Sequence, residues 1–255
     1  NRENNLANYL AETVQVDEFI KAVIAVCDYV KARKKSNKTI YLSFDEWNVW
    51  FHSNEQDKQI EPWTKAPRLL EDIYTFEDAL VVGLFLITLL KHADRIRIAC
   101  LAQLVNVIAP IMTSAGGGVR KQTIYYPYYH ASKYGRGTVL RPEILSPVYD
   151  TDRYKKVNLV EAIGVLSEDE PEMTIFAVNR CQDSPIELEC NLNNMVNFEL
   201  IEHLVLEHDD MKAANTEEDP DRVKPHNQGR TLVKSNRVLA ELPALSWNVV
   251  RLRLN

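Results

Sequence analysis

Asp45 and Glu46 are neighbouring carboxylates that follow a short apolar stretch and stand directly before Trp47 and Trp50. Retaining glycosidases use two carboxyl groups about 5–5.5 Å apart, one as nucleophile and one as acid/base. Flat aromatic rings suit such a site because they pack against the apolar faces of sugars. These residue types favour sugar chemistry. The alternative at this point is that the two carboxylates only cap the segment that follows.

The chain before these carboxylates, and for some distance after them, alternates between helical and strand patterns. The predicted elements are a helix at 17–35, a strand at 38–44, a helix at 76–93, a strand at 95–101 and a helix at 122–134. We expect Asp17 to cap the first helix. Such alternation predicts parallel α/β units. In α/β barrels, a carboxylate at the carboxyl end of a strand is typically catalytic, and Glu46 would occupy that position.

The pattern changes near Gly135-Arg-Gly137, after which apolar runs are short and separated by turns. This pattern predicts an antiparallel β-sandwich, with a long exposed loop at 209–229. We therefore expect two domains, one over residues 1–136 and one over 137–255. The predicted strands of the second are 160–166, 173–179, 186–192, 198–206, 237–242 and 247–254.

The first of these domains is too short for a closed barrel, which needs about 250 residues. Two strands and three helices make either a small open domain or the end of a longer polypeptide. The sequence begins Asn1-Arg-Glu-Asn-Asn5, which is neither an initiator Met nor a signal peptide. We therefore expect the other barrel strands to lie upstream.

Composition excludes several classes of function. The formal net charge of −6 argues against nucleic acid and anionic membranes as partners, and no apolar stretch is long enough to predict a transmembrane helix. The cysteines and histidines show no zinc spacing. Cys27 and Cys100 are predicted to be buried thiols within apolar segments, and Cys181 and Cys190 could in principle pair. Gly116-Gly-Gly118 lacks the lysine of a phosphate loop and is predicted to be a turn.

The segment Ser43-Phe-Asp-Glu-Trp-Asn-Val-Trp50 resembles the nucleophile segment of glycoside hydrolase family 51, the α-L-arabinofuranosidases. The resemblance continues in collinear order along essentially the whole chain, which is similar to the C-terminal half of a family member. Further motifs that carry it are Glu61-Pro-Trp63, Lys91-His-Ala-Asp94, Gln122-Thr-Ile-Tyr-Tyr-Pro127, Tyr134-Gly-Arg-Gly137 and Leu245-Ser-Trp-Asn-Val249.

This resemblance implies roles for three residues. Glu46 matches the catalytic nucleophile at the end of the seventh barrel strand, Gln103 matches a residue that hydrogen-bonds the arabinose, and Trp50 matches an aromatic that lines the sugar site. The family's acid/base glutamate lies on the fourth strand and is absent from this chain. Asp45 is a poor substitute, because neighbours along a strand point to opposite faces.

The resemblance also implies the fold and the reaction. The fold would be strands 7 and 8 of a (β/α)₈ TIM barrel followed by a jelly-roll sandwich. The activity would be that of an exo-acting retaining α-L-arabinofuranosidase on arabinan, arabinoxylan or derived oligosaccharides, without metal or cofactor. Its partners would be the N-terminal half of the enzyme and further copies, commonly in a hexamer, in the cytoplasm.

Two alternatives stay open. The chain could belong to a related retaining glycosidase, an endo-glucanase or β-xylosidase, because the barrel and nucleophile would look the same. The chain alone could instead be a non-catalytic carbohydrate-binding fragment, because it lacks an acid/base.

Overall fold

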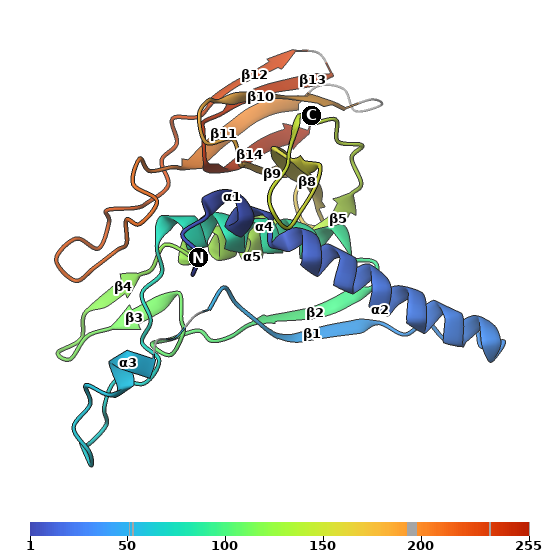
Figure 1. Cartoon of the computed structure of the whole chain (residues 1–255). Coiled ribbons are helices and arrows are strands. Elements are labelled where there is room, and N and C mark those ends of the chain that lie inside the picture. Colours follow the sequence, from blue (N-terminus) through green and yellow to red (C-terminus); the bar gives the residue numbers. More distant parts are fainter. Residues whose placement is uncertain (51, 53, 193–197, 235, 255) are drawn as a thin grey trace.

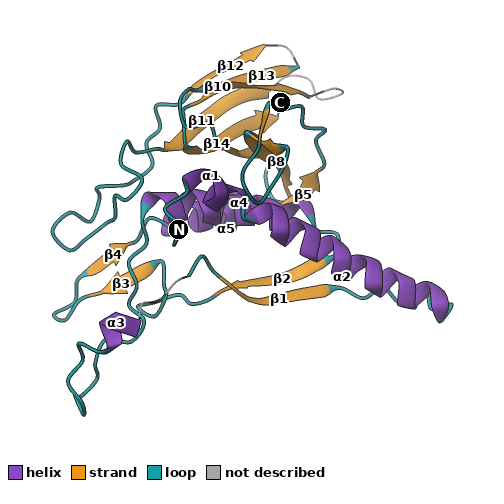
Figure 2. Ribbon diagram, in the orientation of Figure 1, coloured by secondary structure: helices purple, strands orange, loops and turns teal. Residues whose placement is uncertain are grey.

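The computed structural model describes residues 1–50, 52, 54–192, 198–234 and 236–254 of the chain, and arranges them in layers (Figure 1). A two-stranded sheet forms one side, a helix layer lies in the middle, and a β-sandwich forms the other side (Figure 2). In the sequence, the two-stranded sheet and the helices of the middle layer precede the sandwich. The expected fold class, parallel α/β units followed by a jelly-roll-like sandwich, is confirmed.

The α/β part contains two units in which a helix precedes a strand. Strands β1 and β2 pair in parallel, with Phe44 opposite Ala99 and Trp47 opposite Leu101. The antiparallel pair β3 and β4 surrounds the turn at Gly116 and Gly117. The elements are α1 (Leu6–Ala11), α2 (Thr13–Arg33), β1 (Leu42–Trp47), α3 (Asn54–Asp57), α4 (Phe76–Lys91), β2 (Ile96–Leu101), β3 (Ile111–Thr113), β4 (Val119–Lys121) and α5 (Tyr125–Tyr134).

Helix α4 is the central element of the helix layer. Its apolar residues occur nearly all round, which predicts burial on every side, and most of its residues are indeed buried. Its first turn is closed by a capping box in which the Thr75 backbone N–H donates to Asp78 (2.7 Å). Gly83 permits the closest approach of the sandwich, because a Cβ there would lie 2.5 Å from the Trp247 ring.

Helix α2 differs from its prediction in two ways. It begins at Thr13, so Asp17 lies inside the helix and does not cap it. Asp17 instead bonds to His92 (2.6 Å) and to Lys21 (2.5 Å). Two of the apolar side chains on which the prediction rested, Phe19 and Val30, are 60% and 38% exposed, and Val26 and Tyr29 are exposed as well.

The sandwich consists of two antiparallel sheets, with strand orders β11-β14-β9-β8-β5 and β10-β13-β12. The six predicted strands are present within one residue of their expected ends, whereas β5, β6, β7 and β12 were not predicted. The strands after residue 136 are β5 (Gly137–Leu140), β6 (Val148–Tyr149), β7 (Val157–Asn158), β8 (Val160–Ser167), β9 (Glu172–Asn179), β10 (Ile186–Asn191), β11 (Phe198–Leu206), β12 (Arg230–Lys234), β13 (Arg237–Leu242) and β14 (Ser246–Leu254), of which β6 and β7 form a separate antiparallel pair.

The five-stranded sheet is covered on both faces. Along β9, Phe176 and Val178 join the cluster around α4, while Ile175 and Ala177 join the cluster between the two sheets. This is the two-residue periodicity of a strand, with both faces apolar. The sheet therefore belongs to two hydrophobic cores at once and holds the sandwich against the helix layer.

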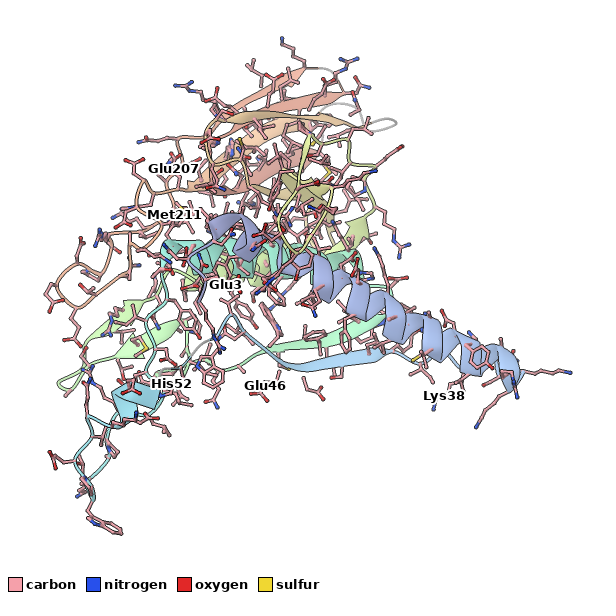
Figure 3. All side chains as sticks on the ribbon, in the orientation of Figure 1. Glu3, Lys38, Glu46, His52, Glu207 and Met211 are labelled. Atoms are coloured by element: carbon pink, nitrogen blue, oxygen red, sulfur yellow. The ribbon has the colours of Figure 1, made fainter. Side chains whose placement is uncertain are left out.

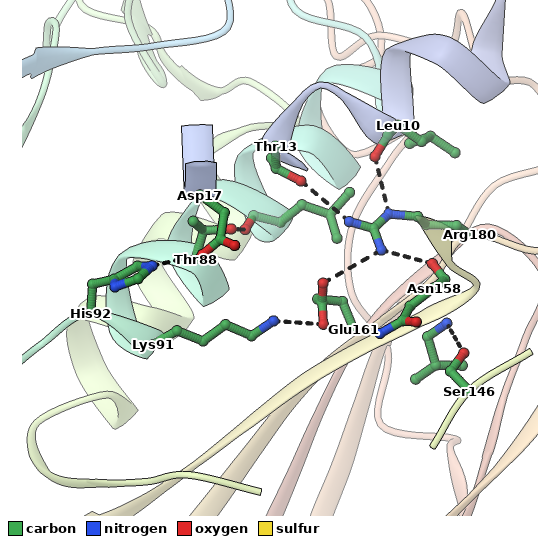
Figure 4. A network of polar contacts seen from close by, with 12 residues as sticks. Leu10, Thr13, Asp17, Thr88, Lys91, His92, Ser146, Asn158, Glu161 and Arg180 are labelled. Atoms are coloured by element: carbon green, nitrogen blue, oxygen red, sulfur yellow. Dashed lines mark hydrogen bonds and ion pairs between the residues drawn. The ribbon is translucent and has the colours of Figure 1, made fainter. Parts of the chain in front are cut away.

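A buried arginine joins the first helices to the sandwich (Figure 4). The Arg180 guanidinium donates to the Leu10 backbone oxygen (3.0 Å), the Thr13 hydroxyl (3.2 Å) and the Asn158 backbone oxygen (2.8 Å). Glu161 lies 3.7 Å from it and pairs with Lys91 of α4 at 2.6 Å. The start of α2 and the end of α4 are thus tied to the same point of the sandwich.

Candidate active site

Glu46 lies at the carboxyl end of β1, on an exposed part of the strand. Figure 3 shows its side chain pointing away from the helix layer. The helix-facing positions of the same strand are occupied by Phe44 and Trp47, which join the core around α4. Trp47 stacks on Phe85 of α4 at a ring separation of 5.4 Å. This packing fixes the strand end and leaves the carboxylate free to meet a ligand.

The alternation of side chains is interrupted beside Glu46. The register of β1 with β2 shifts between Phe44 and Trp47. Phe44 and Trp47, three residues apart, both pack toward the helices, while Asp45 and Glu46 between them are both exposed. An irregularity of this kind interrupts the two-residue period at this position, and that Asp45 and Glu46 face opposite sides stays a prediction. Asp45 is distinguished instead by a hydrogen bond that it accepts from Ser43, within its own strand.

Gln103 follows the carboxyl end of β2, next to the end of β1. The Ala102 backbone N–H donates to the Trp47 oxygen (2.9 Å), so the parallel pairing extends to the residue before Gln103. The Gln103 N–H donates to the Ile108 oxygen (3.2 Å), and its side chain is exposed. The structure thus places Glu46 and Gln103 on adjacent strand ends, as parallel strands of one sheet require.

Asn48 braces the loops that follow the two strands. Its Nδ2 donates to the Ala102 oxygen (2.7 Å), the Ile108 oxygen (2.8 Å) and the Tyr74 hydroxyl (3.0 Å). These acceptors come from two segments of the chain, one at Tyr74 and one in the loop after β2. The amide therefore fixes where the loop carrying Trp50 and the loop carrying Gln103 stand relative to each other.

Trp50 is half exposed and is held by a carboxylate that sequence reasoning missed. Its Nε1–H donates to Asp72 Oδ2 (2.8 Å), and the other Asp72 oxygen lies 2.9 Å from His52 Nδ1. His52 Nε2 lies 3.0 Å from Asp57 Oδ1. Hydrogen bonds to Asp72 and then to Asp57 raise the pKa of His52 above its usual 6.5. Asp72 gave no signal in the sequence, because its partners stand about twenty residues away.

Gln122 is a second residue that sequence reasoning did not assign. It is buried, and its side chain bonds to the backbone of three residues from two other segments. Its Nε2 donates to the oxygens of Asp72 (3.0 Å) and Ala109 (2.8 Å), and its Oε1 accepts from the Tyr74 N–H (2.9 Å). A buried amide satisfied in this way fixes the backbone around Asp72.

The face of the two-stranded sheet that carries Glu46 is open. Ile98 of β2 is 53% exposed, and Cys100 is exposed although a core position was expected. Leu104 and Val105, in the loop after β2, are also exposed. Contiguous apolar side chains on the face of a sheet are normally covered. Within the described residues, no group of three or more metal-ligating side chains is found.

Comparison with known proteins agrees with this geometry. The family described as "Alpha-L-arabinofuranosidase C-terminal domain" matches residues 45–246. An intracellular exo-alpha-(1->5)-L-arabinofuranosidase of Halalkalibacterium halodurans is 58% identical over 252 residues, which is 99% of this chain and 50% of that protein. A protein of the same kind from Bacillus subtilis is 56% identical over 99% of this chain and 50% of its own length.

A solved structure supports the same assignment. The structure of a family 51 alpha-L-arabinofuranosidase from Bifidobacterium longum superposes with a TM-score of 0.87 at 38% identity, over 97% of this chain and 48% of that one. The chain belongs to glycoside hydrolase family 51, the α-L-arabinofuranosidases. It spans about half the length of the curated relatives it matches. Among the described residues, no helix is long and apolar enough to cross a membrane.

Proposed function

We propose that this chain supplies the nucleophile half of a retaining exo-acting α-L-arabinofuranosidase. The observation that carries the proposal is an exposed Glu46 at the carboxyl end of a parallel strand, with Gln103 at the end of the adjacent strand and Trp50 on the following loop. Relatives named as exo-arabinofuranosidases share more than half of the residues over nearly the whole chain. The substrates would be α-L-arabinofuranosyl groups at the ends of arabinan, arabinoxylan or oligosaccharides from them.

The reaction would proceed by double displacement. A Glu46 carboxylate oxygen attacks the anomeric carbon as the bond to the leaving-group oxygen breaks and a carboxylic acid from upstream protonates that oxygen. Water, deprotonated by the same upstream group, then displaces Glu46 and releases arabinose with retained configuration. Gln103 would hold the sugar by hydrogen bonds and Trp50 by ring contact. Asn48 would keep these two residues in register.

The missing barrel strands would come from the polypeptide that precedes this chain. Residues 1–136 would then complete the catalytic barrel, and residues 137–255 would form the sandwich domain. The exposed apolar side chains of α2 and β2 support this arrangement, because a closed barrel would cover both elements. The enzyme would act in the cytoplasm, because the similar arabinofuranosidases of Halalkalibacterium halodurans and Bacillus subtilis are described as intracellular. Assembly into a homo-oligomer stays a prediction.

The test is substitution of Glu46 in the complete enzyme. Glu46→Ala should lower kcat on 4-nitrophenyl α-L-arabinofuranoside by about four orders of magnitude, because no covalent intermediate can form. Added azide should restore part of the activity by attacking from the vacated space and should give an arabinosyl azide of inverted configuration.

Two comparisons make this test specific. Asp45→Ala should not respond to azide, and a response there in place of Glu46 would reject the assignment of the nucleophile. The wild-type enzyme should act on the arabinofuranoside in preference to aryl β-xyloside and glucan. The opposite preference would reject the proposed substrate.

A further inference from the structure

The indole of Trp50 makes a hydrogen bond that can fix the orientation of its ring. The indole is half exposed, so burial alone does not fix its rotation. Its Nε1–H is nevertheless satisfied by an ionisable oxygen of Asp72 at 2.8 Å. A charge-assisted hydrogen bond of this kind is stronger than a bond to water or to a neutral acceptor. The ring is thus held at its edge while half of its surface stays exposed.

Asp72 also engages a second ring with its other oxygen. Oδ1 lies 2.9 Å from His52 Nδ1, and His52 Nε2 lies 3.0 Å from Asp57. Both imidazole nitrogens therefore face carboxylate oxygens, which can only accept, so this arrangement favours the doubly protonated, cationic ring. The Trp50 and His52 rings are nearly parallel, at 12° and a centroid separation of 6.4 Å. One carboxylate thereby aligns two rings of the same loop.

The carboxylate is itself immobile. Asp72 is 8% exposed, and its backbone oxygen accepts from the buried Gln122 amide, which also accepts from the Tyr74 N–H. Tyr74 in turn contacts Asn48, two residues before Trp50. Asp72 is therefore fixed to the packed start of α5 and α4, while Trp50 stands on a loop. The hydrogen bond between Trp50 and Asp72 therefore restrains the exposed ring through a residue that is packed in the core.

We propose that Asp72 is a positioning residue, which acts through Trp50 to hold the indole in the orientation that binds the sugar, with His52 aligned beside it. This proposal rests on the proposed function, in which Trp50 lines the sugar site. Asp72 does not touch the substrate. Without it, the indole would rotate on its loop and would have to be ordered again each time a sugar binds.

The expected effect is on binding rather than on the chemical step. Ordering one freed side chain at a binding site weakens binding about three- to tenfold. In the complete enzyme, Asp72→Ala should raise KM for 4-nitrophenyl α-L-arabinofuranoside by this factor and change kcat by less than about twofold. Asp72→Asn keeps an oxygen that can accept from Trp50, so its KM should lie between those of Asp72→Ala and the wild type.

A double-mutant cycle separates positioning from a general structural role. Trp50→Phe keeps an aromatic ring but has no N–H to donate, so it removes the same hydrogen bond to Asp72 by changing the donor. Adding Asp72→Ala to Trp50→Phe should not raise KM further, because the two residues act as one unit. If Asp72→Ala does not fold, the isosteric Asp72→Asn replaces it in the same cycle.

A matched control is Asp78→Asn, six residues along the chain. Asp78 is a half-buried carboxylate that also accepts a hydrogen bond from an aromatic side chain, the Tyr9 hydroxyl at 2.5 Å. This substitution should lower the thermal midpoint without raising KM. Effects of Asp72 and Trp50 that multiply, or a loss confined to kcat, would overturn the positioning role. Lack of arabinofuranosidase activity in the wild-type enzyme would instead overturn the proposed function.

Discussion

The two sides of the helix layer differ in how completely they are packed. On the sandwich side, α4 meets the five-stranded sheet so closely that Gly83 leaves no room for a Cβ against Trp247. On the other side, β1 and β2 leave Ile98 and Cys100 exposed, and no further strand pairs with them among the described residues. The candidate catalytic residue lies on the open side. The closed side therefore supplies stability, and under the proposed function the open side presents the nucleophile to the preceding half of the enzyme.

The largest fully buried side chain of the closed side is that of Trp247. Trp247 is 1% exposed and stacks on Phe176. Trp247→Ala should lower the free energy of unfolding by about 4 kcal/mol, because it leaves a cavity between α4 and the sheet. Chemical denaturation measures this change. Leu232→Ala, at an exposed position of β12, should cost less than about 0.5 kcal/mol. Equal losses in the two variants would contradict the picture of a closed side.

Acidification should weaken the same side through His130. Trp247 Nε1–H donates to His130 Nδ1 (3.1 Å), which must be unprotonated to accept. Burial, assisted by Lys133, lowers the pKa of His130 from 6.5 to about 4. Between these two values the unfolded chain binds a proton that the folded chain does not, so stability is present above about pH 6.5 and falls as the pH drops toward 4. The loss attributable to His130 is at most about 3 kcal/mol.

The measurement for His130 is the free energy of unfolding at pH 7 and at pH 4.5, in the wild type and in His130→Gln. The difference between the two pH dependences isolates this residue from the many carboxylates that titrate in the same range. A wild-type curve that parallels the variant's would show that His130 is not the group responsible.

The smallest effect concerns the open side and leaves stability unchanged. Cys100 is exposed, whereas burial raises the pKa of Cys190 to about 11. A thiol reagent at pH 8 should modify the exposed Cys100 faster than Cys190, because the raised pKa of Cys190 leaves little of the reactive thiolate. In the complete enzyme, Cys100 should become protected at least about tenfold. Mass spectrometry of each site reports this ratio. Equal labelling of Cys100 with and without the preceding half would show that no barrel closes over β2.

The fold was largely predictable because its signals are local. The apolar residues around α4 predicted its burial, and six strands of the sandwich followed from short apolar runs between turns. The surroundings of Asp17 and Cys100, by contrast, depend on parts of the chain that are distant in sequence. Asp17 bonds to His92, 75 residues away, and the exposure of Cys100 depends on chain that would lie opposite β2. The apolar periodicity of the sequence therefore could predict neither the partner of Asp17 nor the exposure of Cys100.

The candidate site likewise contains residues that were predictable from the sequence and residues that were not. Glu46 was identifiable as a carboxylate at a strand end, and the family motif gave it a role. The residues that hold the site, Asp72 and Gln122, were not identified, because a single Asp or Gln in a loop gives no pattern. The interruption of β1 beside Asp45 was also invisible, since an irregularity of register exists only with respect to a partner strand.

The hydrogen bonds of the buried Arg180 restrict how the sequence of the first helix can change among relatives. Two of its three hydrogen bonds end on main-chain oxygens, those of Leu10 and Asn158, which every residue type provides. Substitutions at positions 10 and 158 therefore leave the two acceptors of Arg180 in place, although Leu10 is also buried in the core around α4. An inserted or deleted residue in α1 would instead move the oxygen away from the guanidinium. Relatives that share this arginine should therefore strictly conserve the length of the first helix.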